Sequence, residues 1–401
     1  MKISIIGGGI TGCIVALVAL RKGYTVSLYE KDERLGGIMK DIWINNDCFF
    51  NNCHYLENDN AWLKNFKPIL SESLYDFNHI YSSITDFSEN VIIQNNFAQP
   101  VFNIKFNKNE FNNIRAKSVL NRIRSYPFSI SNKLQKWSSN FGPIDKLHIA
   151  GINSMQIGRI MIKKDNDIVF KHKKIDKNID DLLGLPYDKL YPKHPKILSS
   201  IPHFGYDAFF SNIYSILIKN GCKLFFSENI NCKYKNKNLS FFNSSKEEIL
   251  ADKFIWTGNP TKIINSTNTK KLSPNLTKML TIVGSISKYN NKHPIYHQIF
   301  SLKNSIFRVF IYKIKSIKFT IEAFDKQLSE KQIYEDIKYI FELLSINQYK
   351  ISGIYKQNRY NYLTINDYNL LKDFKTDKKL MNNHWHLYSR DDKIEYITSQ
   401  L

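Results

Sequence analysis

The stretch Lys2-Ile-Ser-Ile-Ile-Gly-Gly-Gly-Ile-Thr-Gly12, together with Tyr29-Glu-Lys-Asp-Glu-Arg-Leu-Gly-Gly37, decides the fold of this chain. The apolar run Ile3–Ile6 predicts a strand that enters a glycine-rich turn, and apolar residues at helical spacing follow the turn. A second apolar run, 26–29, ends at Glu30. This order of strand, turn, helix and strand is the context in which a G-x-G-x-x-G pattern predicts a dinucleotide-binding unit.

The three glycines of the pattern have different physical roles. Gly7 permits a tight turn, Gly9 lets the backbone approach a pyrophosphate, and Gly12 lets the helix pack closely on the strand. The helix start, with Ile10 and Thr11, supplies N–H donors and the positive end of the helix dipole. We therefore expect these five residues to bind the phosphates of the dinucleotide.

The residues after the second strand narrow the identity of the cofactor. Glu30 stands about twenty residues beyond the glycines, where a carboxylate accepts hydrogen bonds from a ribose. The doublet Gly36-Gly37 after Glu-Arg-Leu narrows the expected dinucleotide to FAD, and Lys31 belongs to the same stretch. We expect Glu30, Lys31, Gly36 and Gly37 to contribute to the cofactor site.

The formal charge of the 401-residue chain is +21, which raises the question of a nucleic-acid partner. The lysines are spread along the whole chain among many Asn and Ile residues and form no single basic stripe. This pattern is typical of the codon usage of an AT-rich genome, so we expect no nucleic-acid binding. An attraction for anionic substrates or membrane surfaces is a milder consequence of the charge.

Cysteine usage and hydropathy exclude several other classes of protein. The five cysteines are odd in number and contain no C-x-x-C pair, so neither a disulfide framework nor a metal site is expected. The apolar N-terminal stretch contains the glycine triad and lacks the basic start and cleavage site of a signal peptide. No other segment is long and apolar enough to span a bilayer, so we expect a cytoplasmic protein.

The stretch 29–37 resembles the N-terminal FAD fingerprint of glutathione-reductase-type flavoproteins. The similarity is to the branch that holds amine oxidases, protoporphyrinogen oxidases and UDP-galactopyranose mutases. Three further features resemble the mutases specifically: segment 97–104, Tyr191 with segment 201–206, and segment 254–258. The resemblance implies that Thr257 and Gly258, in the last segment, return the chain to FAD.

The expected fold class is α/β, with a Rossmann-like FAD-binding domain and an inserted α+β substrate domain. The resemblance divides the FAD-binding domain into three segments, 1–58, 190–272 and 366–401. The intervening segments, 59–189 and 273–365, are expected to face the substrate.

Within the insertions, we expect amphipathic helices over 111–125 and 330–344, because apolar residues there recur at helical spacing. Strand-like runs are expected at 155–163, 307–312 and 318–323. The most polar stretch, Lys171 to Asp181, is expected to be a solvated loop.

The C-terminus departs from the pattern of the resembling flavoproteins, which end in a strand, a Gly-Arg pair, a Tyr-x-Tyr loop and a helix. Here 385–388 is expected to be the strand, Ser389-Arg390 replaces Gly-Arg, and the helix follows at once. Arg390 is expected to contact the cofactor, and Asp391 and Asp392 to cap the helix. In addition, Phe319 stands where the mutases have an arginine. These departures argue against mutase activity, but they do not argue against FAD binding.

His54 is the candidate catalytic residue. The mutases place a histidine loop beside the isoalloxazine ring at this point in the sequence, and a histidine there could tune the flavin by hydrogen bonding. A loop histidine without a special role is the alternative. The neighbouring Cys53 has no paired base in the sequence and is expected to be a buried thiol.

Five residues are candidates for substrate binding. Tyr187, Tyr191 and Tyr206 fall in the segment that contacts substrate in the resembling family, although aromatic core packing is the alternative for each. Arg159 and Arg308 lie on strand-like runs, and a guanidinium group can bind a diphosphate with two parallel hydrogen bonds.

Three functions remain open from the sequence. The chain could be a flavoenzyme acting on a nucleotide sugar in polysaccharide or cell-surface glycan biosynthesis, as the mutase resemblance implies. It could instead be an amine-oxidase-like or desaturase-like oxidoreductase that passes a hydride to flavin, or a non-catalytic FAD-binding protein. No second G-x-G-x-x-G pattern is present, so an external reductant would be required.

Overall fold

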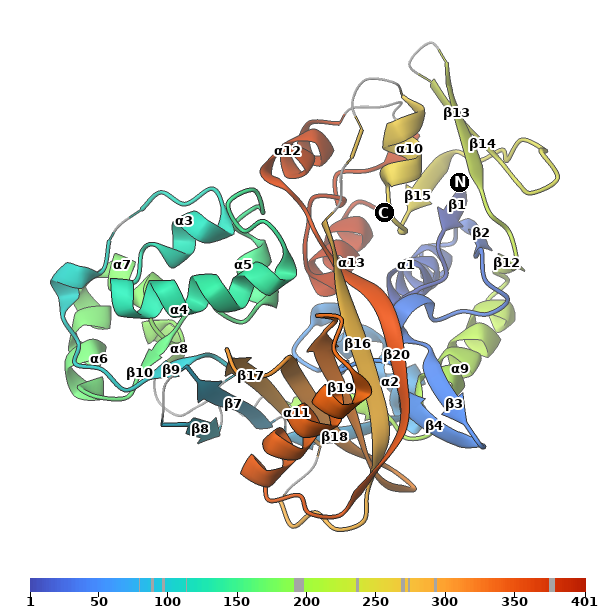
Figure 1. The fold of residues 1–401 in the computed structure, drawn as a ribbon. Coiled ribbons are helices and arrows are strands. Elements are labelled where there is room, and N and C mark those ends of the chain that lie inside the picture. The colour runs from blue at the N-terminus through green and yellow to red at the C-terminus, as the bar shows by residue number, and fades with distance from the viewer. Residues whose placement is uncertain are drawn as a thin grey trace.

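The computed structural model describes residues 1–78, 80–87, 90–95, 98–112, 114–190, 198–235, 238–267, 271–272, 275–291, 294–374 and 379–401. Two sheets and a helical lobe make up most of this part of the chain (Figure 1). The α/β class expected from the sequence is confirmed.

The first sheet is parallel and carries the glycine-rich turn. Its order is β12 (Lys223–Phe225), β2 (Thr25–Tyr29), β1 (Lys2–Ile6), β15 (Lys253–Trp256) and β21 (Leu380–Met381). Every neighbouring pair in it is parallel. Because β1 lies at its centre, the turn that follows β1 is flanked by the chain leaving β2 and the chain leaving β15.

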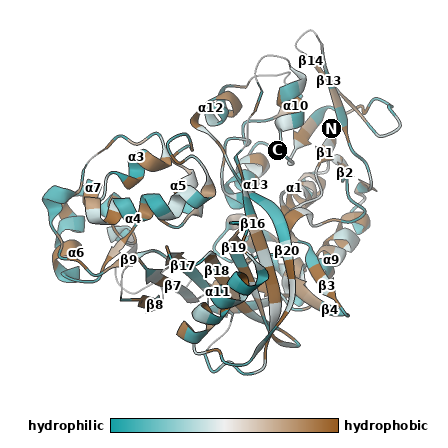
Figure 2. Cartoon of the chain, in the orientation of Figure 1, coloured by the Kyte–Doolittle hydropathy of each residue, from teal (hydrophilic) through white to brown (hydrophobic). Residues whose placement is uncertain are grey.

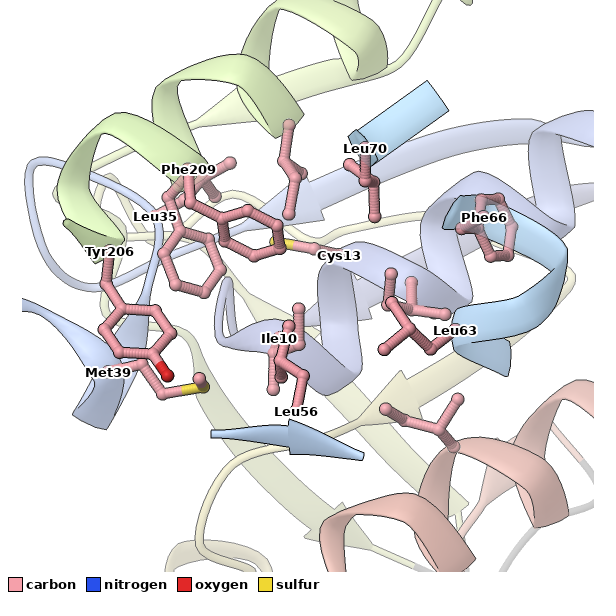
Figure 3. Packing of buried hydrophobic residues seen from close by; sticks show 14 of the residues in the cluster. Ile10, Cys13, Leu35, Met39, Leu56, Leu63, Phe66, Leu70, Tyr206 and Phe209 are labelled. Atoms are coloured by element: carbon pink, nitrogen blue, oxygen red, sulfur yellow. The ribbon is translucent and has the colours of Figure 1, made fainter. Parts of the chain in front are cut away.

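Helix α1 (Ile10–Arg21) packs with α9 (Tyr206–Lys219) and α13 (Arg390–Ser399) beside this sheet. Most of α1 is buried, because apolar or small residues cover nearly its whole circumference. Figure 3 shows Ile10 and Cys13 in one cluster with Leu63 and Phe66 of α2 (Ala61–Leu70) and with Phe209 of α9. The helix start is thereby fixed against the strand that precedes it.

The second sheet has seven strands and is mostly antiparallel. Its order is β20 (Tyr349–Tyr362), β16 (Asn275–Ile286), β19 (Ser316–Phe324), β18 (Ile306–Ile314), β17 (Ile295–Ser301), β7 (Ile80–Asp86) and β8 (Ile92–Asn95). Figure 2 shows a largely apolar β16 beside the hydrophilic second half of β20. Helix α11 (Glu330–Leu343) covers one face with Ile333, Ile337 and Ile340.

A helical lobe lies beside the second sheet, at the left of Figure 1. It contains α3 (Val119–Ile123), α4 (Phe128–Ser138), α5 (Gly151–Ser154), α6 (Asn166–Ile175) and α7 (Lys177–Leu182). Trp137 and Phe141 of its core pack against Phe300, Phe307 and Phe324 of the sheet. The face of the sheet opposite α11 therefore meets the helical lobe over part of its area.

The strands of the first sheet all fall within segments 1–58, 190–272 and 366–401, and those of the second within 59–189 and 273–365. A small antiparallel sheet connects these two sets of segments. In it, β11 (Leu198–Pro202) pairs with β5 (Leu56–Glu57) on one side and with β6 (Leu74–Asn78) on the other.

Three expectations for the insertions were wrong. The expected helix over 111–125 is confined to α3, where Ser118 and Asn121 form a capping box that starts the helix late. The strand-like run 155–163 contributes only β10 (Met161–Ile162). The polar stretch 171–181 is helical, because Asp176 caps α7 and the apolar side chains of Ile179 and Leu182 reach the lobe core.

The expectation for the C-terminus also needs correction. Residues 385–388 form no strand, and the last strand of the parallel sheet is β21. Trp385 instead donates from its indole Nε1 to the carbonyl oxygen of Trp256 at 3.0 Å, which fixes this segment at the end of β15. The N-cap of α13 is Ser389, not Asp391 or Asp392, because the Ser389 side chain accepts the N–H of Asp392.

Asp41 connects the hairpin of β3 (Asp41–Ile44) and β4 (Asp47–Phe50) to helix α9. Its Oδ2 accepts the backbone N–H of Asp207 at 2.8 Å in the first turn of α9. Burial, with a smaller contribution from the charge of Asp207, raises the pKa of Asp41 to about 6. The ionised form is thus disfavoured in the folded protein.

We expect Asp41→Asn to stabilise the protein at neutral pH. An unfolded Asp ionises near pKa ~3.9, so the folded state loses stability as the pH rises from that value through the folded pKa of about 6. Chemical denaturation should show a gain of about 2–3 kcal/mol near pH ~7.5 and little near pH ~4. Asp59→Asn, at an exposed carboxylate, is the control and should change neither value. A loss of stability at both pH values would contradict this assignment.

Candidate functional site

The turn between β1 and α1 has the backbone geometry that a pyrophosphate requires. Gly7 has φ +112°, and its N–H donates to the carbonyl oxygen of Tyr29 at 2.8 Å. A Cβ on Gly12 would lie 1.9 Å from the carbonyl oxygen of Gly7, so only glycine fits there. Around a Cβ on Gly9, in contrast, no atom lies within 4 Å. Gly9 therefore marks the side of the turn that is open to a ligand.

Glu30 is 4% exposed and lies directly beside this turn. Its Oε2 accepts the N–H of Gly8 at 2.5 Å, and its Oε1 accepts the N–H of Asp32 at 3.0 Å. These bonds fix the carboxylate orientation, while each oxygen keeps a further lone pair. Its position at the end of β2 fits the role expected from the sequence, acceptance of ribose hydroxyls.

The glycine doublet also closes on the turn. Gly36 donates its N–H to the carbonyl oxygen of Gly8 at 2.9 Å and has φ +123°, which favours glycine. A Cβ on Gly37 would lie 3.2 Å from the Cα of Gly9. Lys31, next to Glu30, is exposed.

The chain that leaves β15 returns to the same turn. The Thr257 hydroxyl oxygen lies 3.1 Å from the carbonyl oxygen of Ile6 and 3.1 Å from that of Gly7, and these oxygens accept its hydrogen bond. The N–H of Gly258 lies 3.3 Å from the position that a Cβ on Gly7 would occupy. Two of the predicted cofactor residues, Thr257 and Gly258, are thus brought beside the glycine turn.

These residues fit a dinucleotide. Helix α1 has the glycine Gly9 as N-cap, which provides no side-chain acceptor, and its first turn contains no acidic residue. The first N–H groups, including those of Ile10 and Thr11, are therefore suited to a pyrophosphate, and Glu30 is suited to the ribose. Arg390, at the start of α13, donates from Nε and Nη2 to the two carboxylate oxygens of Asp391, each at 3.0 Å.

His54 lies in the loop between β4 and β5, half-buried, and contacts β20. Its Nε2 lies 3.0 Å from Nη2 of Arg359. A guanidinium group cannot accept a hydrogen bond, so Nε2 must be the acceptor, and the neutral ring carries its proton on Nδ1. Burial above all, followed by the charges of Arg359, Arg390 and Arg308, holds the pKa of His54 well below its usual value. His54 is therefore a neutral hydrogen-bond donor at physiological pH.

Two buried polar side chains of the second sheet, Arg308 and Glu322, hold this loop in place. Arg308 Nη1 donates to Glu322 Oε2 at 3.2 Å, and the other oxygen of Glu322 accepts the N–H of Cys53 at 3.3 Å. Arg308 also donates to Gln298 Oε1 at 3.1 Å and to the carbonyl oxygen of Ser154 at 2.6 Å. The guanidinium group of Arg308 thus already has protein acceptors on all three of its nitrogens.

Three tyrosines lie together beside His54. The ring of Tyr55 is 5.9 Å from that of Tyr296 and 6.1 Å from that of Tyr81. The Tyr55 hydroxyl donates to the Tyr81 hydroxyl, which donates to Glu57, each at 3.1 Å. Burial raises the pKa of Glu57 above its usual value. An aromatic surface with one partly desolvated carboxylate therefore adjoins the His54 loop.

The structure brings some of the predicted substrate residues to this place and leaves others elsewhere. Tyr206 donates its hydroxyl to the carbonyl oxygen of His54 at 2.9 Å, so it is a neighbour of the loop. Arg159 donates from Nη1 to backbone carbonyls of the helical lobe, those of Asp180 and Gly184. The Tyr187 ring packs on Phe170 in that lobe.

Phe97 and Tyr191 lie outside the described residues. Cys53 is buried, and its pKa lies well above the usual value because of that burial, so the expected unreactive thiol agrees with its surroundings.

Several residues of this place were missed by the sequence reasoning. Gln298, Arg308 and Glu322 are polar residues inside otherwise apolar strands, which is a usable signal because such residues need buried partners. Of these three residues, only Arg308 was named as a candidate from the sequence. No sequence pattern indicates Arg359 or Tyr55, because the position of Arg359 depends on the register of β20 and that of Tyr55 on the His54 loop.

Among the described residues, no group of three or more His, Cys, Asp or Glu side chains could hold a metal ion. No described helix is long and apolar enough to cross a membrane.

Comparisons with known proteins agree with this geometry. Residues 5–62 match the family model described as an NAD(P)-binding Rossmann-like domain. The chain is also similar to 4,4'-diapolycopen-4-al dehydrogenase from Metabacillus indicus, with 65% identity over 37 residues. That segment is 9% of this chain and 8% of the dehydrogenase, so this likeness concerns a short stretch only.

Solved structures show the same fold over nearly the whole chain. Reduced UDP-galactopyranose mutase has a TM-score of 0.70 and 13% identity, over 99% of this chain and 94% of that one. Wild-type putrescine oxidase bound to putrescine has a TM-score of 0.61 and 11% identity, over 100% and 98%. An oxidoreductase from Methanosarcina mazei has a TM-score of 0.56 and 12% identity, over 100% and 99%.

The chain therefore shares its fold with UDP-galactopyranose mutase and putrescine oxidase, and the resemblance drawn from its sequence is confirmed at the level of the fold.

Two glycine variants should separate cofactor binding from folding. Gly9 has φ −72°, which any residue adopts, and open space around its Cβ, so Gly9→Val should fold normally and block the pyrophosphate. The purified variant should be colourless and show a cooperative thermal transition. Gly12→Ala should instead fold poorly, because of the contact with Gly7. Stoichiometric FAD in Gly9→Val, measured by absorbance, would show that the turn does not bind the phosphates.

Proposed function

We propose that this protein is an FAD-dependent oxidoreductase that removes a hydride from a small, uncharged organic substrate. The contacts of the three arginines near His54 carry the proposal. Arg308 is paired with Glu322, Arg390 is paired with Asp391, and Arg359 contacts the His54 ring and the carbonyl oxygen of Asn51. A diphosphate needs cations whose charge is not already balanced, whereas the three tyrosines beside His54 suit an apolar or weakly polar molecule.

The proposal includes the location of the protein and its partners. None of the five cysteines forms a disulfide, which supports a reducing compartment, and we place the protein in the cytoplasm. The partners are a small-molecule substrate and a separate electron donor or acceptor, without nucleic acid.

In this proposal each residue near the loop has a defined task. FAD, when bound, supplies the acceptor for the hydride. Neutral His54 presents the N–H of Nδ1 as a donor, and Arg359 holds the ring by its other nitrogen. Glu57 is a candidate proton acceptor, because its pKa is raised and its hydrogen bond to Tyr81 connects it to Tyr55.

The second candidate is an enzyme acting on a nucleotide sugar in polysaccharide or cell-surface glycan biosynthesis. The observation that favours it is the TM-score of 0.70 with UDP-galactopyranose mutase. Against it stand Phe319 in place of an arginine, the missing tyrosine loop at the C-terminus, and the protein acceptors that already engage Arg159 and Arg308. We therefore rank it second.

One pair of experiments on the purified holoprotein distinguishes the two candidates. Under anaerobic conditions, a panel of primary alcohols, aldehydes and amines is added to the oxidised protein, and loss of the visible flavin absorbance is followed. We expect at least one compound to bleach the flavin. In parallel, the reduced protein is incubated with UDP-galactose and borohydride, and mass spectrometry is expected to find no flavin–sugar adduct. An adduct without any bleaching would reverse our ranking.

The pairing of His54 with Arg359 gives a separate prediction. His54→Ala should lower turnover by roughly 10²-fold and leave the FAD content unchanged, because a positioned hydrogen-bonding group is lost. Arg359→Gln removes one of the charges that lower the His54 pKa, so that pKa should rise, while burial still holds it below the usual value. The decrease of activity at acid pH should then begin at a higher pH in this variant than in the wild type.

Lys356→Gln is the matched control, since Lys356 is an exposed cation on the same strand, β20. It should keep the pH profile of the wild type. If Arg359→Gln and the wild type show the same dependence of activity on pH, the titration of His54 does not control activity.

A further inference from the structure

A row of polar side chains crosses the second sheet on one face. In successive strands Ser83 is in register with Gln298, Gln298 with Arg308, and Arg308 with Glu322. Thr281 is in register with Glu322 at the other end of the row. Residues in register on neighbouring strands point to the same face. All five side chains are buried, between apolar residues of the helical lobe on one side and of the aromatic cluster on the other.

The middle of the row is satisfied by hydrogen bonds, but one end is not. Gln298 Oε1 accepts from Arg308 Nε at 3.1 Å and from the Tyr296 hydroxyl at 2.9 Å. Since Arg308 can only donate, the amide oxygen of Gln298 must face it, and Nε2 of Gln298 points the other way. Within the described chain, neither Gln298 Nε2 nor Ser83 Oγ has a hydrogen-bond partner, although both residues are 0% exposed.

Gln298 adjoins the cluster of Tyr55, Tyr81 and Tyr296 near His54. The Tyr296 ring, whose hydroxyl bonds Gln298, lies 5.9 Å from the Tyr55 ring and 6.2 Å from the Tyr81 ring. Tyr55 directly follows His54 in the loop. The Tyr296 hydroxyl therefore connects the three tyrosines near His54 to the polar row at Gln298.

We propose that Gln298 Nε2 and Ser83 Oγ are a pair of donors that bind an uncharged acceptor oxygen, a carbonyl or hydroxyl oxygen, of the substrate. A cation offers no lone pair to an N–H donor. An anion would be buried beside Arg308, whose charge Glu322 already balances, so it would lose its hydration without gaining a counter-charge. The pair thus selects neutral oxygen compounds. This inference rests on the proposed oxidoreductase function and names its substrate class.

Small aromatic probes test the donor pair without knowledge of the substrate. The probes are benzyl alcohol and benzaldehyde, which are neutral oxygen acceptors, with benzylamine, benzoate and toluene as comparisons of equal ring size. Binding to the oxidised holoprotein is measured by perturbation of flavin absorbance and by thermal shift. We expect the two oxygen acceptors to bind about tenfold tighter than each of the other three, the scale of one added hydrogen bond.

Two variants remove the donors one at a time. Gln298→Glu keeps the oxygen that Tyr296 and Arg308 need and replaces the N–H₂ group, while Ser83→Ala removes the hydroxyl alone. Each should weaken benzyl alcohol about five- to tenfold. Thr281→Val is the matched control, because the Thr281 hydroxyl is also buried without a partner in the described chain but lies on the far side of the Arg308–Glu322 pair. It should not change the affinity.

Thermal stability gives a second readout for Ser83. If its hydroxyl is kept for a ligand, Ser83→Ala should leave the melting temperature of the ligand-free protein unchanged or raise it. A marked decrease would mean that the hydroxyl bonds a structural water, and this result would overturn the proposal. Equal affinities for all five probes, wild-type affinity in both donor variants, or no saturable binding of any probe would also overturn it.

The outcomes for this inference and for the proposed function are distinguishable. A protein that is reduced by a substrate but is indifferent to the donor variants contradicts the donor pair alone. A protein that shows the expected binding pattern but accepts no hydride from any compound contradicts the oxidoreductase function alone.

Discussion

The close contact between the start of α1 and the turn after β1 is the constraint on which the rest of this structure depends. Gly12 approaches the carbonyl oxygen of Gly7 so closely that no side chain fits between them. This contact sets the helix against the central strand of the parallel sheet. The chains that leave β2 and β15 then reach the turn from both sides and bring Glu30 and Thr257 to it. A local packing rule thus assembles a site from segments that are far apart in sequence.

The position of the His54 loop depends on the second sheet. The N–H of Phe50 donates to the Tyr312 hydroxyl at 2.7 Å, and the carbonyl oxygen of Phe50 accepts from the Thr320 hydroxyl at 2.7 Å. Beyond it, the N–H of Cys53 donates to Glu322. Buried side chains of β18 and β19 therefore supply the hydrogen bonds that the loop backbone cannot make for itself. The loop carries the candidate histidine, and the sheet determines where that histidine lies.

The sequence was informative where local chemistry decides the structure. The glycine turn, the acid after the second strand and the α/β class followed from spacing and residue type, because each needs specific residues at specific positions. Segment 385–388 was misread as a strand because Trp385 packs with Trp256 and hydrogen-bonds the end of β15, and the segment pairs with no strand. Arg359 could not be found, since its contact with His54 joins residues 305 positions apart through the register of β20. Tertiary pairing of this kind leaves no local pattern in the sequence.

The stability of the folded protein alone does not explain the polar row in the second sheet. A buried ion pair such as Arg308–Glu322 is often no more stabilising than apolar residues of the same volume, and buried polar groups without partners reduce stability. Yet the row lies between two apolar clusters that could have met directly across it. Its Arg308 and Glu322 hold the His54 loop and the helical lobe at a fixed distance from the sheet, through Cys53 and Ser154. The second sheet, the His54 loop and the helical lobe meet at this row. Polar side chains replace apolar packing there and form a polar site of fixed geometry.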